Sequence, residues 1–465
     1  MNKETLPSYL AEAKANPLSN RAPWFKNTAP SYAGIILWFV FWNEIAKCGG
    51  VPGGGLAWGI GLPIISIIFA ALVCFALFYF VPGMFGLKTG LPLYVVGSSV
   101  FGTKGGIIMP GLLMGILQFG WVGVNIFASS VLLHETLSMV PLYVIMIVWG
   151  AAATFIGLKG IQYVAKISTY LPLIPLVILI YLIFKTACFV GDFDSAKLVA
   201  ESVKSAAATS PAAAASEPLS QFAIFSIIST VVIGFFATAG AAGVDFGTNA
   251  RNTKDVALGG LVGVTLAMIF TGVAAVLILA GAYANPEVSQ KLFASGSPIV
   301  VTETFKALLG DGTAKFLMFM LAIAAFPAAC FSSLIAANSF KTMLPKVNST
   351  LAVSVGGIAA IALAISGYAG ESAKVFNIIG ASFGPICGAM CVDYFMNKCN
   401  WSGPRAGLNP AGWLAWAIGF IVGILPFMGV EIPLAPICAF VAGAVVYAIC
   451  SMIGLKSKVI EDFKA

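Results

Sequence analysis

The sequence predicts an all-α polytopic membrane protein with about 12 transmembrane helices. Of its 465 residues, 59% are hydrophobic and only 9% are charged, and the mean hydropathy is +0.97. Soluble domains usually carry about 25% charged residues, so this composition excludes a soluble protein. Segments of roughly 20 apolar residues recur along the chain, and each can cross a bilayer core of about 30 Å as a helix.

The apolar segments are separated by short polar or glycine-rich stretches. Residues 1–30 form a polar tail, residues 31–455 a single transmembrane domain, and residues 456–465 a second tail. The alanine-rich run 205–216 predicts that residues 187–220 are a mobile external connector. We place the helices at about 31–54, 56–80, 106–132, 137–158, 160–186, 221–246, 256–283, 314–341, 349–368, 371–396, 411–430 and 432–454.

Basic residues are distributed unequally between the two sides of this arrangement. If residues 1–30 lie in the cytosol, every inside loop carries at least two lysines or arginines, whereas the loops near Glu135 and Glu431 carry none. The positive-inside rule therefore predicts a multi-pass protein of the cell membrane with both termini cytoplasmic. The basic residues are scattered singly, so we expect a lipid bilayer and a small molecule as partners, no nucleic acid and no obligate protein partner.

The first apolar segment contains an unusual combination of residues. Six glycines and prolines crowd the stretch 49–55, and Glu44 and Lys47 precede it. A helix that breaks at membrane depth must be buried in protein or line a wet cavity, as at many transporter sites. Glu44 and Lys47 are three residues apart and can neutralise each other on one helix face. They could instead serve substrate binding or ion coupling, or lie nearer the membrane surface.

A second interrupted helix is predicted at residues 233–245, five helices after the first. Its small residues fit either an unwound segment or a tight helix contact. The offset is expected for two five-helix repeats of opposite topology that each contribute a broken first helix. Repeat one would then span about residues 31–186 and repeat two about 221–396, with two extra helices at about 411–454.

Polar and aromatic residues on two helices are candidates for a binding site. Gln118, Trp121 and Asn125 are three and four residues apart, so they share one helix face. An indole and two amides suit a planar heterocycle with ring nitrogens and carbonyls, although the amides could also hold the bundle together. Ser332 and Ser333 could coordinate a small cation or hydrogen-bond to their own helix.

Enzyme signatures are missing or unsupported in this sequence. No Gly-x-x-x-x-Gly-Lys-Ser/Thr loop is present, which argues against ATP-driven pumping by this chain. The run Gly380–Gly384 matches a nucleophile-elbow pattern, but it lies in an apolar helix instead of a strand-to-helix turn. We therefore expect that the protein is not an enzyme.

The chain resembles the nucleobase:cation symporter-1 family, which includes cytosine, purine, allantoin and hydantoin permeases. The resemblance extends from the first tail to the tenth helix, and the order and spacing of its motifs make it specific. These motifs are Ala22-Pro-Trp-Phe-Lys26, Gln118-Phe-Gly-Trp-Val-Gly123, Phe235-Phe236, Val244-Asp-Phe246, Asn249-Ala-Arg-Asn252, Ile335-Ala-Ala-Asn-Ser339, Gly384-Pro-x-x-Gly388 and Asp393-Tyr-Phe-Met-Asn-Lys398.

The resemblance implies a LeuT-type fold of five-plus-five inverted repeats with two C-terminal helices. It implies that Trp121 stacks on one face of the substrate and Phe236, beside Phe235, on the other. Asn338 would hydrogen-bond the ring, and Gln118 and Asn125 would lie beside it.

A sodium ion is a possible coupling ion, and no other cofactor is expected. The resemblance implies that its ligands are backbone carbonyls and two hydroxyls, from Trp38, Phe41, Ala329, Ser332 and Ser333. Glu44 and Lys47 depart from the family pattern, because small or neutral residues are expected there.

These expectations point to a secondary active transporter that imports a nucleobase or related planar heterocycle by sodium or proton symport with alternating access. One alternative is a proton-coupled carrier of an amino acid or charged vitamin precursor that uses Glu44 and Lys47. Another is a membrane receptor that senses a nucleobase without transporting it.

Overall fold

The computed structural model describes residues 6–27, 38–50, 52–159, 171, 173–209, 217–241, 243–294, 301–344, 346–461 and 463. Within these residues the chain is helical, with two isolated β-bridges. Ten of the described helices are long and apolar enough to cross a membrane. The predicted all-α polytopic class is therefore confirmed.

The first half of the chain supplies helices that overlap the predicted segments, with bounds that differ by several residues. Two of them contain a π-helical turn, which joins α4 to α5 and precedes α8. Their bounds are α3 (Trp38–Lys47), α4 (Gly61–Val73), α5 (Phe80–Thr89), α8 (Leu113–Thr136), α9 (Leu142–Lys159) and α11 (Leu173–Thr186).

The second half follows the same pattern, and a π-turn also joins α16 to α17. The longest helix, α20, has 33 residues. The bounds are α14 (Gln221–Ala241), α15 (Gly243–Gly247), α16 (Thr253–Gly260), α17 (Ala267–Ala284), α20 (Asp311–Met343), α21 (Ser349–Ile365), α22 (Ser372–Met396), α23 (Pro410–Ile424) and α24 (Ala435–Met452).

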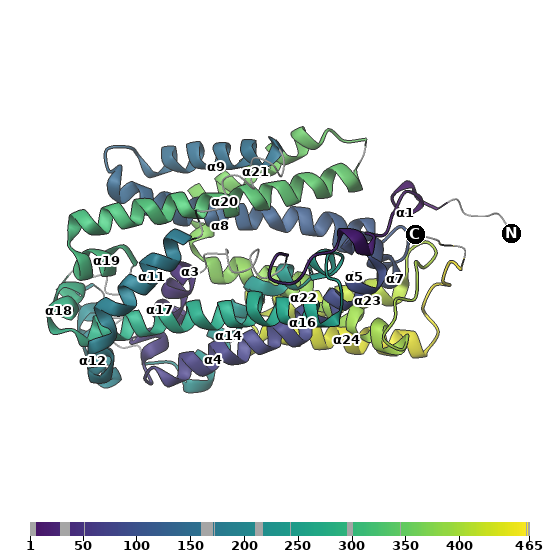
Figure 1. The fold of residues 1–465 in the computed structure, drawn as a ribbon. Helices are drawn as coiled ribbons and strands as arrows, with labels where there is room; N and C mark the ends of the chain where they lie inside the picture. The colour runs from purple at the N-terminus through teal and green to yellow at the C-terminus, as the bar shows by residue number, and fades with distance from the viewer. Residues whose placement is uncertain are drawn as a thin grey trace.

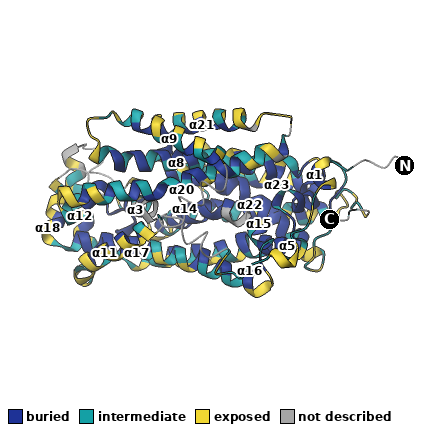
Figure 2. Ribbon diagram, turned by 45° about the horizontal axis from the view of Figure 1, so that its top comes forward, coloured by how far each residue is buried: buried dark blue, intermediate teal, exposed yellow. Residues whose placement is uncertain are grey.

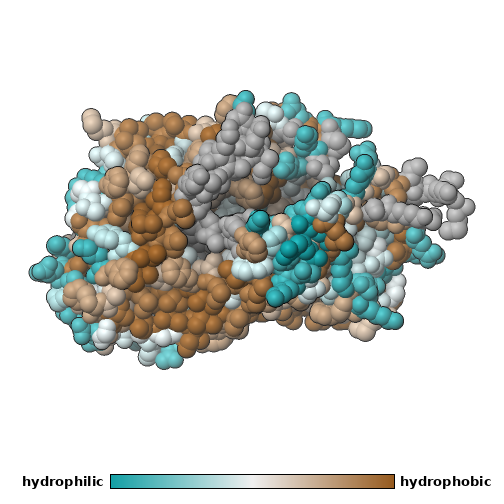
Figure 3. Space-filling view, viewed as in Figure 1, coloured by the Kyte–Doolittle hydropathy of each residue, from teal (hydrophilic) through white to brown (hydrophobic). Residues whose placement is uncertain are grey.

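The long helices run side by side, and shorter helices lie at the two ends of the molecule (Figure 1). One end carries α12 (Ser195–Thr209), α18 (Pro286–Ala294) and α19 (Val301–Leu309), and we call it the far end. The other carries α1 (Ser8–Ala11), α7 (Ser98–Phe101) and the chain after α24, and we call it the terminal end. Hydrophobic side chains cover much of the middle of the visible face, as a bilayer requires (Figure 3).

The helices that meet in the interior are α8, α14, α20 and α22, along which buried residues concentrate (Figure 2). Helix α8 packs against α20, α9 and α21, whereas α22 packs against α14, α23 and α24. Gly234 permits the contact between α14 and α22, because a Cβ there would lie 2.3 Å from the carbonyl oxygen of Phe376. This close approach brings side chains of both helices into one interior cluster.

The glycine-rich stretch 49–55 does not lie within an α-helix, which differs from the prediction. Helix α3 ends at Lys47, two 3-10 turns follow, and α4 begins at Gly61. The stretch is therefore a tight connection between two helices and not a break inside a membrane span. Close packing requires glycine at position 54, because Gly54 has φ +52° and a Cβ there would lie 1.7 Å from the carbonyl oxygen of Ala46.

The expected mobile connector at 187–220 is wrong for the part that the structure describes. Residues Ala187–Asp192 form a 3-10 helix and α12 follows it. Leu198 of α12 is 4% exposed, and the position of a Cβ on Gly53 lies 2.7 Å from Val199. Helix α12 thus covers the α3–α4 connection. Residues 210–216 of the alanine-rich run lie outside the described residues.

The second predicted interruption, at residues 233–245, is only partly described. Helix α14 is continuous to Ala241, residue 242 lies outside the described part, and α15 begins at Gly243. Any break therefore falls between α14 and α15, near the end of the predicted range.

Candidate functional site

Three aromatic rings from three helices meet in the interior. The ring of Trp121 on α8 lies 4.1 Å from that of Phe235 on α14, at an interplanar angle of 81°. It also lies 5.0 Å from the ring of Phe376 on α22, at 31°. Phe235 and Phe376 are themselves 5.0 Å apart. We call these three residues the aromatic cluster; planar molecules pack favourably against aromatic rings of this kind.

The indole of Trp121 is held by a polar contact as well. Its Nε1 donates to Oγ1 of Thr238 at 3.3 Å, and Thr238 is only 5% exposed. Thr238 lies one turn after Phe235 on α14, so the same helix supplies a ring contact and a hydrogen-bond acceptor. The indole N–H is therefore occupied, and the face of the ring is what remains for a ligand.

The two amides predicted on α8 have different environments. Gln118 is 5% exposed, and its Nε2 lies 3.5 Å from the sulfur of Met114, which is a weak acceptor. Asn125 instead donates to the carbonyl oxygen of Ala325 on α20 at 3.2 Å and accepts from Ser129 at 3.3 Å. Asn125 thus links two helices, whereas Gln118 keeps hydrogen-bonding capacity one turn from Trp121.

The other two residues expected to touch the substrate, Phe236 and Asn338, make no described contact with Trp121. Phe236 is 3% exposed, and its ring lies 5.0 Å from that of Phe235. The ring pressed against Trp121 is that of Phe235. Asn338 is exposed on α20, and the neighbouring Ser339 donates to the carbonyl oxygen of Gly111 at 3.3 Å.

The candidate sodium ligands lie on α3 and α20. Ser333 is 1% exposed and donates to the carbonyl oxygen of Ala329 at 3.0 Å, so two expected ligands are adjacent. Ser332 is half-buried one residue before it. Trp38 and Phe41 lie in the first part of α3, and the structure describes only their backbone. In the part of the chain described, no group of three His, Cys, Asp or Glu could hold a metal. Neutral oxygen atoms are thus the available donors.

Glu44 and Lys47 do not pair with each other among the described residues. The half-buried Glu44 accepts a hydrogen bond from the hydroxyl of Ser372, the first residue of α22, and Lys47 is exposed. Glu44 therefore lies beside the first turn of α22. Phe376 lies one turn further along α22, so this contact is close to the aromatic cluster.

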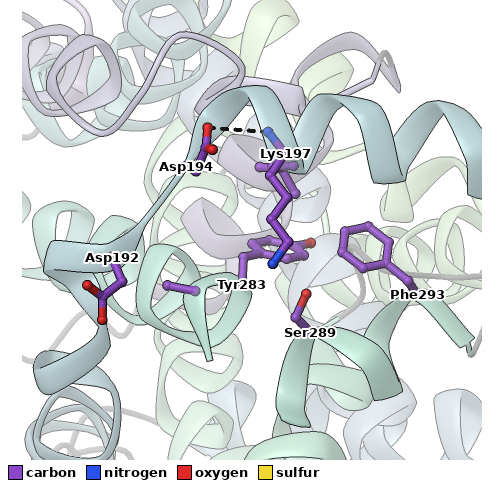
Figure 4. Close-up of a pocket in the computed structure, with 8 residues that line it drawn as sticks. Asp192, Asp194, Lys197, Tyr283, Ser289 and Phe293 are labelled. Atoms are coloured by element: carbon purple, nitrogen blue, oxygen red, sulfur yellow. Dashed lines mark hydrogen bonds between the residues drawn. The ribbon is translucent and has the colours of Figure 1, made fainter. Parts of the chain in front are cut away.

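A recess at the far end lies between α12 and the α17–α18 turn (Figure 4). Its lining includes Asp192, Asp194, Lys197, Tyr283, Ser289 and Phe293. Asp194 accepts from the backbone N–H groups of Ala196 and Lys197 at 2.9 and 3.3 Å, so it caps the start of α12. This carboxylate has a structural role, and the recess is separate from the aromatic cluster.

Apolar helices around buried aromatic and amide side chains place this chain in the class of polytopic membrane proteins, in which many transporters keep a solute site between their helices. The chain belongs to the family of permeases for cytosine/purines, uracil, thiamine and allantoin, whose family model matches residues 33–400. It is therefore a nucleobase:cation symporter family member, as its motifs predicted.

Individual relatives agree with this assignment. The cytosine permease of Escherichia coli strain K12 is 24% identical over 434 residues, which cover 90% of each chain. The transporter Mhp1 of the nucleobase-cation-symport-1 family, closed with bromovinylhydantoin bound, gives a TM-score of 0.62 at 15% identity over 98% of both chains. Its inward-facing conformation gives 0.68 at 14% identity over 98% of this chain and 97% of that chain.

A Na⁺-coupled sialic acid symporter is similar in fold as well, with a TM-score of 0.56 at 13% identity over 99% of this chain and 94% of that chain. At such identities the structures establish the fold. The LeuT-type architecture expected from the sequence is therefore confirmed.

Two residues of this region were missed by the sequence reasoning. Phe376 is 0% exposed and belongs to an apolar helix, where one more phenylalanine is no signal. Thr238 lies among small residues that were interpreted as an unwound segment or a tight helix contact. Its position one turn from Phe235 was the available signal, because both share a helix face.

Proposed function

We propose that this protein is a secondary active transporter that imports a nucleobase-like planar ring together with a cation. The observation that carries the proposal is the aromatic cluster, in which the indole of Trp121 packs against Phe235 and Phe376 one turn from the Gln118 amide. Stacking on an indole suits every planar heterocycle, and an amide adds hydrogen bonds to ring nitrogens and carbonyls. The relatives named as permeases of cytosine and as a transporter with a hydantoin bound support the same class of substrate.

Substrate binding requires a local rearrangement in this proposal. The three rings are in mutual contact, so a substrate ring reaches the face of Trp121 only when Phe376 or Phe235 moves aside. Exposure of the site first to one side and then to the other gives alternating access. Release inside would follow when one group of helices rocks against the other.

A sodium ion is the coupling ion that the oxygen donors favour. Carbonyl and hydroxyl oxygens of Ala329, Ser332 and Ser333, with carbonyls of Trp38 and Phe41, would form a neutral cage for a hard cation. In this proposal, bound sodium holds α3 against α20 and so prepares the substrate site. A site without a carboxylate would release the ion readily at low internal sodium.

Uptake into proteoliposomes tests the substrate and the ion together. Labelled cytosine, hypoxanthine, uracil, allantoin and thiamine are offered with an inward sodium gradient, then without sodium at several pH values. We expect one nucleobase-like ring to accumulate only with sodium. Accumulation driven by a proton gradient alone would show that protons, and not sodium, are the coupling ion. Binding without accumulation would indicate a receptor.

Loss of the indole tests the site itself. Trp121→Ala removes the stacking surface, and aromatic stacking on a base is worth about 1–3 kcal/mol, so the apparent KM should rise about 5- to 150-fold. Trp149→Ala is a matched control, because its ring contacts Phe326 at the α9–α20 interface instead. Normal uptake by Trp121→Ala would show that the substrate binds elsewhere.

A further inference from the structure

The chain before α3 is bound across the terminal end of the molecule. Residues 6–27 contain α1 and a 3-10 turn at Leu18–Asn20. Tyr9 is 9% exposed and Leu10 is 1% exposed, so this segment is packed into the protein. We call residues 6–27 the strap. Its Phe25 is 55% exposed and makes an edge contact with Trp24 at 5.8 Å.

The first attachment of the strap is Tyr9. Its hydroxyl donates to the carbonyl oxygen of Thr103 at 2.7 Å, and burial raises the pKa of the Tyr9 phenol, so it stays protonated. Thr103 follows α7 and is itself tied to the α22–α23 loop. Its N–H donates to the carbonyl oxygen of Arg405 at 2.7 Å, and its hydroxyl accepts from the N–H of Gly407 at 3.0 Å.

The second attachment joins the strap to the end of α5. One guanidinium nitrogen of Arg21 donates to the carbonyl oxygens of Leu87 at 2.8 Å and Ala250 at 3.3 Å. A positive group at the last turn of a helix also interacts favourably with the helix dipole. The N–H of Asn16 donates to the carbonyl oxygen of Gly90, directly after α5, at 2.9 Å. Gly90 leaves no room for a side chain, since its Cβ position lies 3.0 Å from Asn16.

The remaining contacts join the strap to the α15–α16 region. The N–H of Ala22 donates to the carbonyl oxygen of Asn249 at 2.9 Å. The N–H of Trp24 donates to a carboxylate oxygen of Asp255 at 3.2 Å, and the Asn27 amide donates to the carbonyl oxygen of Phe246 at 3.1 Å. Several hydrogen bonds therefore hold the strap here, whereas the first attachment consists of the Tyr9–Thr103 hydrogen bond and the burial of Tyr9 and Leu10.

Helices α5 and α15 behave as one unit because their backbones touch. A Cβ on Gly86 would lie 1.9 Å from the carbonyl oxygen of Val244, and one on Gly247 would lie 2.1 Å from that of Gly83. The strap thus bridges two bodies, which also touch directly where Lys88 of α5 donates to the Cys399 carbonyl oxygen and to the Asn400 side chain. One consists of α5, α15 and α16, and the other of the α7–α8 junction with the α22–α23 loop.

We propose that the strap is a clamp that holds the α5–α15–α16 unit against the α7–α8 junction and releases at Tyr9 when the terminal end opens. This inference rests on the alternating access of the proposed function. The attachment at Tyr9 gives way first because one described hydrogen bond supports the packing there, whereas several hydrogen bonds on the other body act together. The strap therefore biases the ratio of closed to open states at this end.

Amide hydrogen exchange of the full-length protein without substrate tests the clamp. Tyr9→Phe removes only the hydroxyl, and the loss of one hydrogen bond shifts an equilibrium about 3- to 10-fold. We expect residues 80–90 and 243–256 to exchange faster by that factor, because this end opens more often. Tyr368→Phe is the matched control, since Tyr368 is 61% exposed in a 3-10 turn before α22.

Arg21→Gln weakens the second attachment and serves as an independent variant, with thermal unfolding as the check on folding. It should accelerate exchange in the same two regions. If only residues 6–27 exchange faster in both variants, the strap is a passive tail and the clamp is wrong. Because no substrate is present, a clamp effect can be seen even if uptake assays reject the proposed nucleobase substrate.

Discussion

Trp121 can offer a substrate the face of its indole but not its N–H, because that group is directed at Thr238. A ring that lies on this face therefore depends on how firmly the indole is oriented. Phe235 and Phe376 restrict the indole by packing, and Thr238 adds a directional contact. Specific hydrogen bonds to the substrate must then come from amides such as Gln118, which in the described structure has only a sulfur partner.

Replacement of Thr238 tests this orientation. Thr238→Val keeps the shape but removes the acceptor, so the indole N–H loses its partner and the apparent KM for uptake should rise about 3- to 10-fold. Thr238→Ser keeps the hydroxyl and should retain a nearly normal KM. If both variants behave like the unmodified protein, the hydrogen bond does not orient Trp121 for binding.

At the scale of residues, the sequence identifies candidate site residues when their side chains differ in type from their neighbours. Trp121 and Gln118 are distinctive on an apolar helix, and the structure places both in the interior. Phe376 is apolar like many residues of its helix, so the sequence does not distinguish it. The packing of α22 against α14 shows that it belongs to the aromatic cluster. The partner of Glu44 also could not be predicted, because Ser372 is 328 residues away in the chain.

At the scale of elements, the contact between α5 and α15 depends on glycine. A methyl group at Gly86 would collide with the carbonyl oxygen of Val244, whose backbone cannot move freely. We expect Gly86→Ala to destabilise the protein by about 1–3 kcal/mol, which is typical of overpacking. The measurement is the thermal unfolding temperature, which should fall. Gly312→Ala is the control, since no atom lies within 4 Å of its Cβ position, and should not lower that temperature.

The long helices could be predicted because about 20 consecutive apolar residues have few alternatives to a membrane span. The short helices α12, α18 and α19 were missed because they alternate charged and apolar residues, a pattern that loops share. Their position depends on contacts with the protein. Lys306 of α19, for example, pairs with Glu135 of α8 at 2.7 Å and with Glu303 at 3.0 Å. The glycine-rich stretch 49–55 was misplaced because a tight connection and a broken span require the same residues.

At the scale of the whole molecule, a buried polar group joins the two C-terminal helices to the rest of the chain. Asp393 at the end of α22 is 0% exposed and accepts from the Tyr447 hydroxyl of α24 at 2.8 Å. Arg405 lies 3.5 Å from the same carboxylate and donates to the carbonyl oxygens of Ser99 and Ser457, at 2.9 Å each. This arrangement connects α7, α22, α24 and the last segment of the chain.

Removal of the cation from this group should be costly. Arg405→Met leaves Asp393 buried without its counterion, which typically costs about 3–5 kcal/mol. Tyr447→Phe removes one hydrogen bond to the carboxylate and should cost about 1–3 kcal/mol. Thermal unfolding in detergent measures the loss of stability in both variants. The control is Lys204→Met, which removes an exposed ion pair with Glu201 and should have no measurable effect. Equal stability of Arg405→Met and the unmodified protein would contradict the assigned role.

The distribution of basic residues predicts that the terminal end faces the cytosol, and two native cysteines test this orientation. Cys188 is exposed at the far end, and the half-buried Cys399 lies at the terminal end directly after α22. A membrane-impermeant maleimide added to intact cells should therefore modify Cys188 but not Cys399, as located by mass spectrometry of peptides. Cys188→Ser should abolish that signal, and permeabilised cells should add modification at Cys399. Modification of Cys399 in intact cells would contradict the predicted orientation. It would place the strap on the side from which substrate arrives.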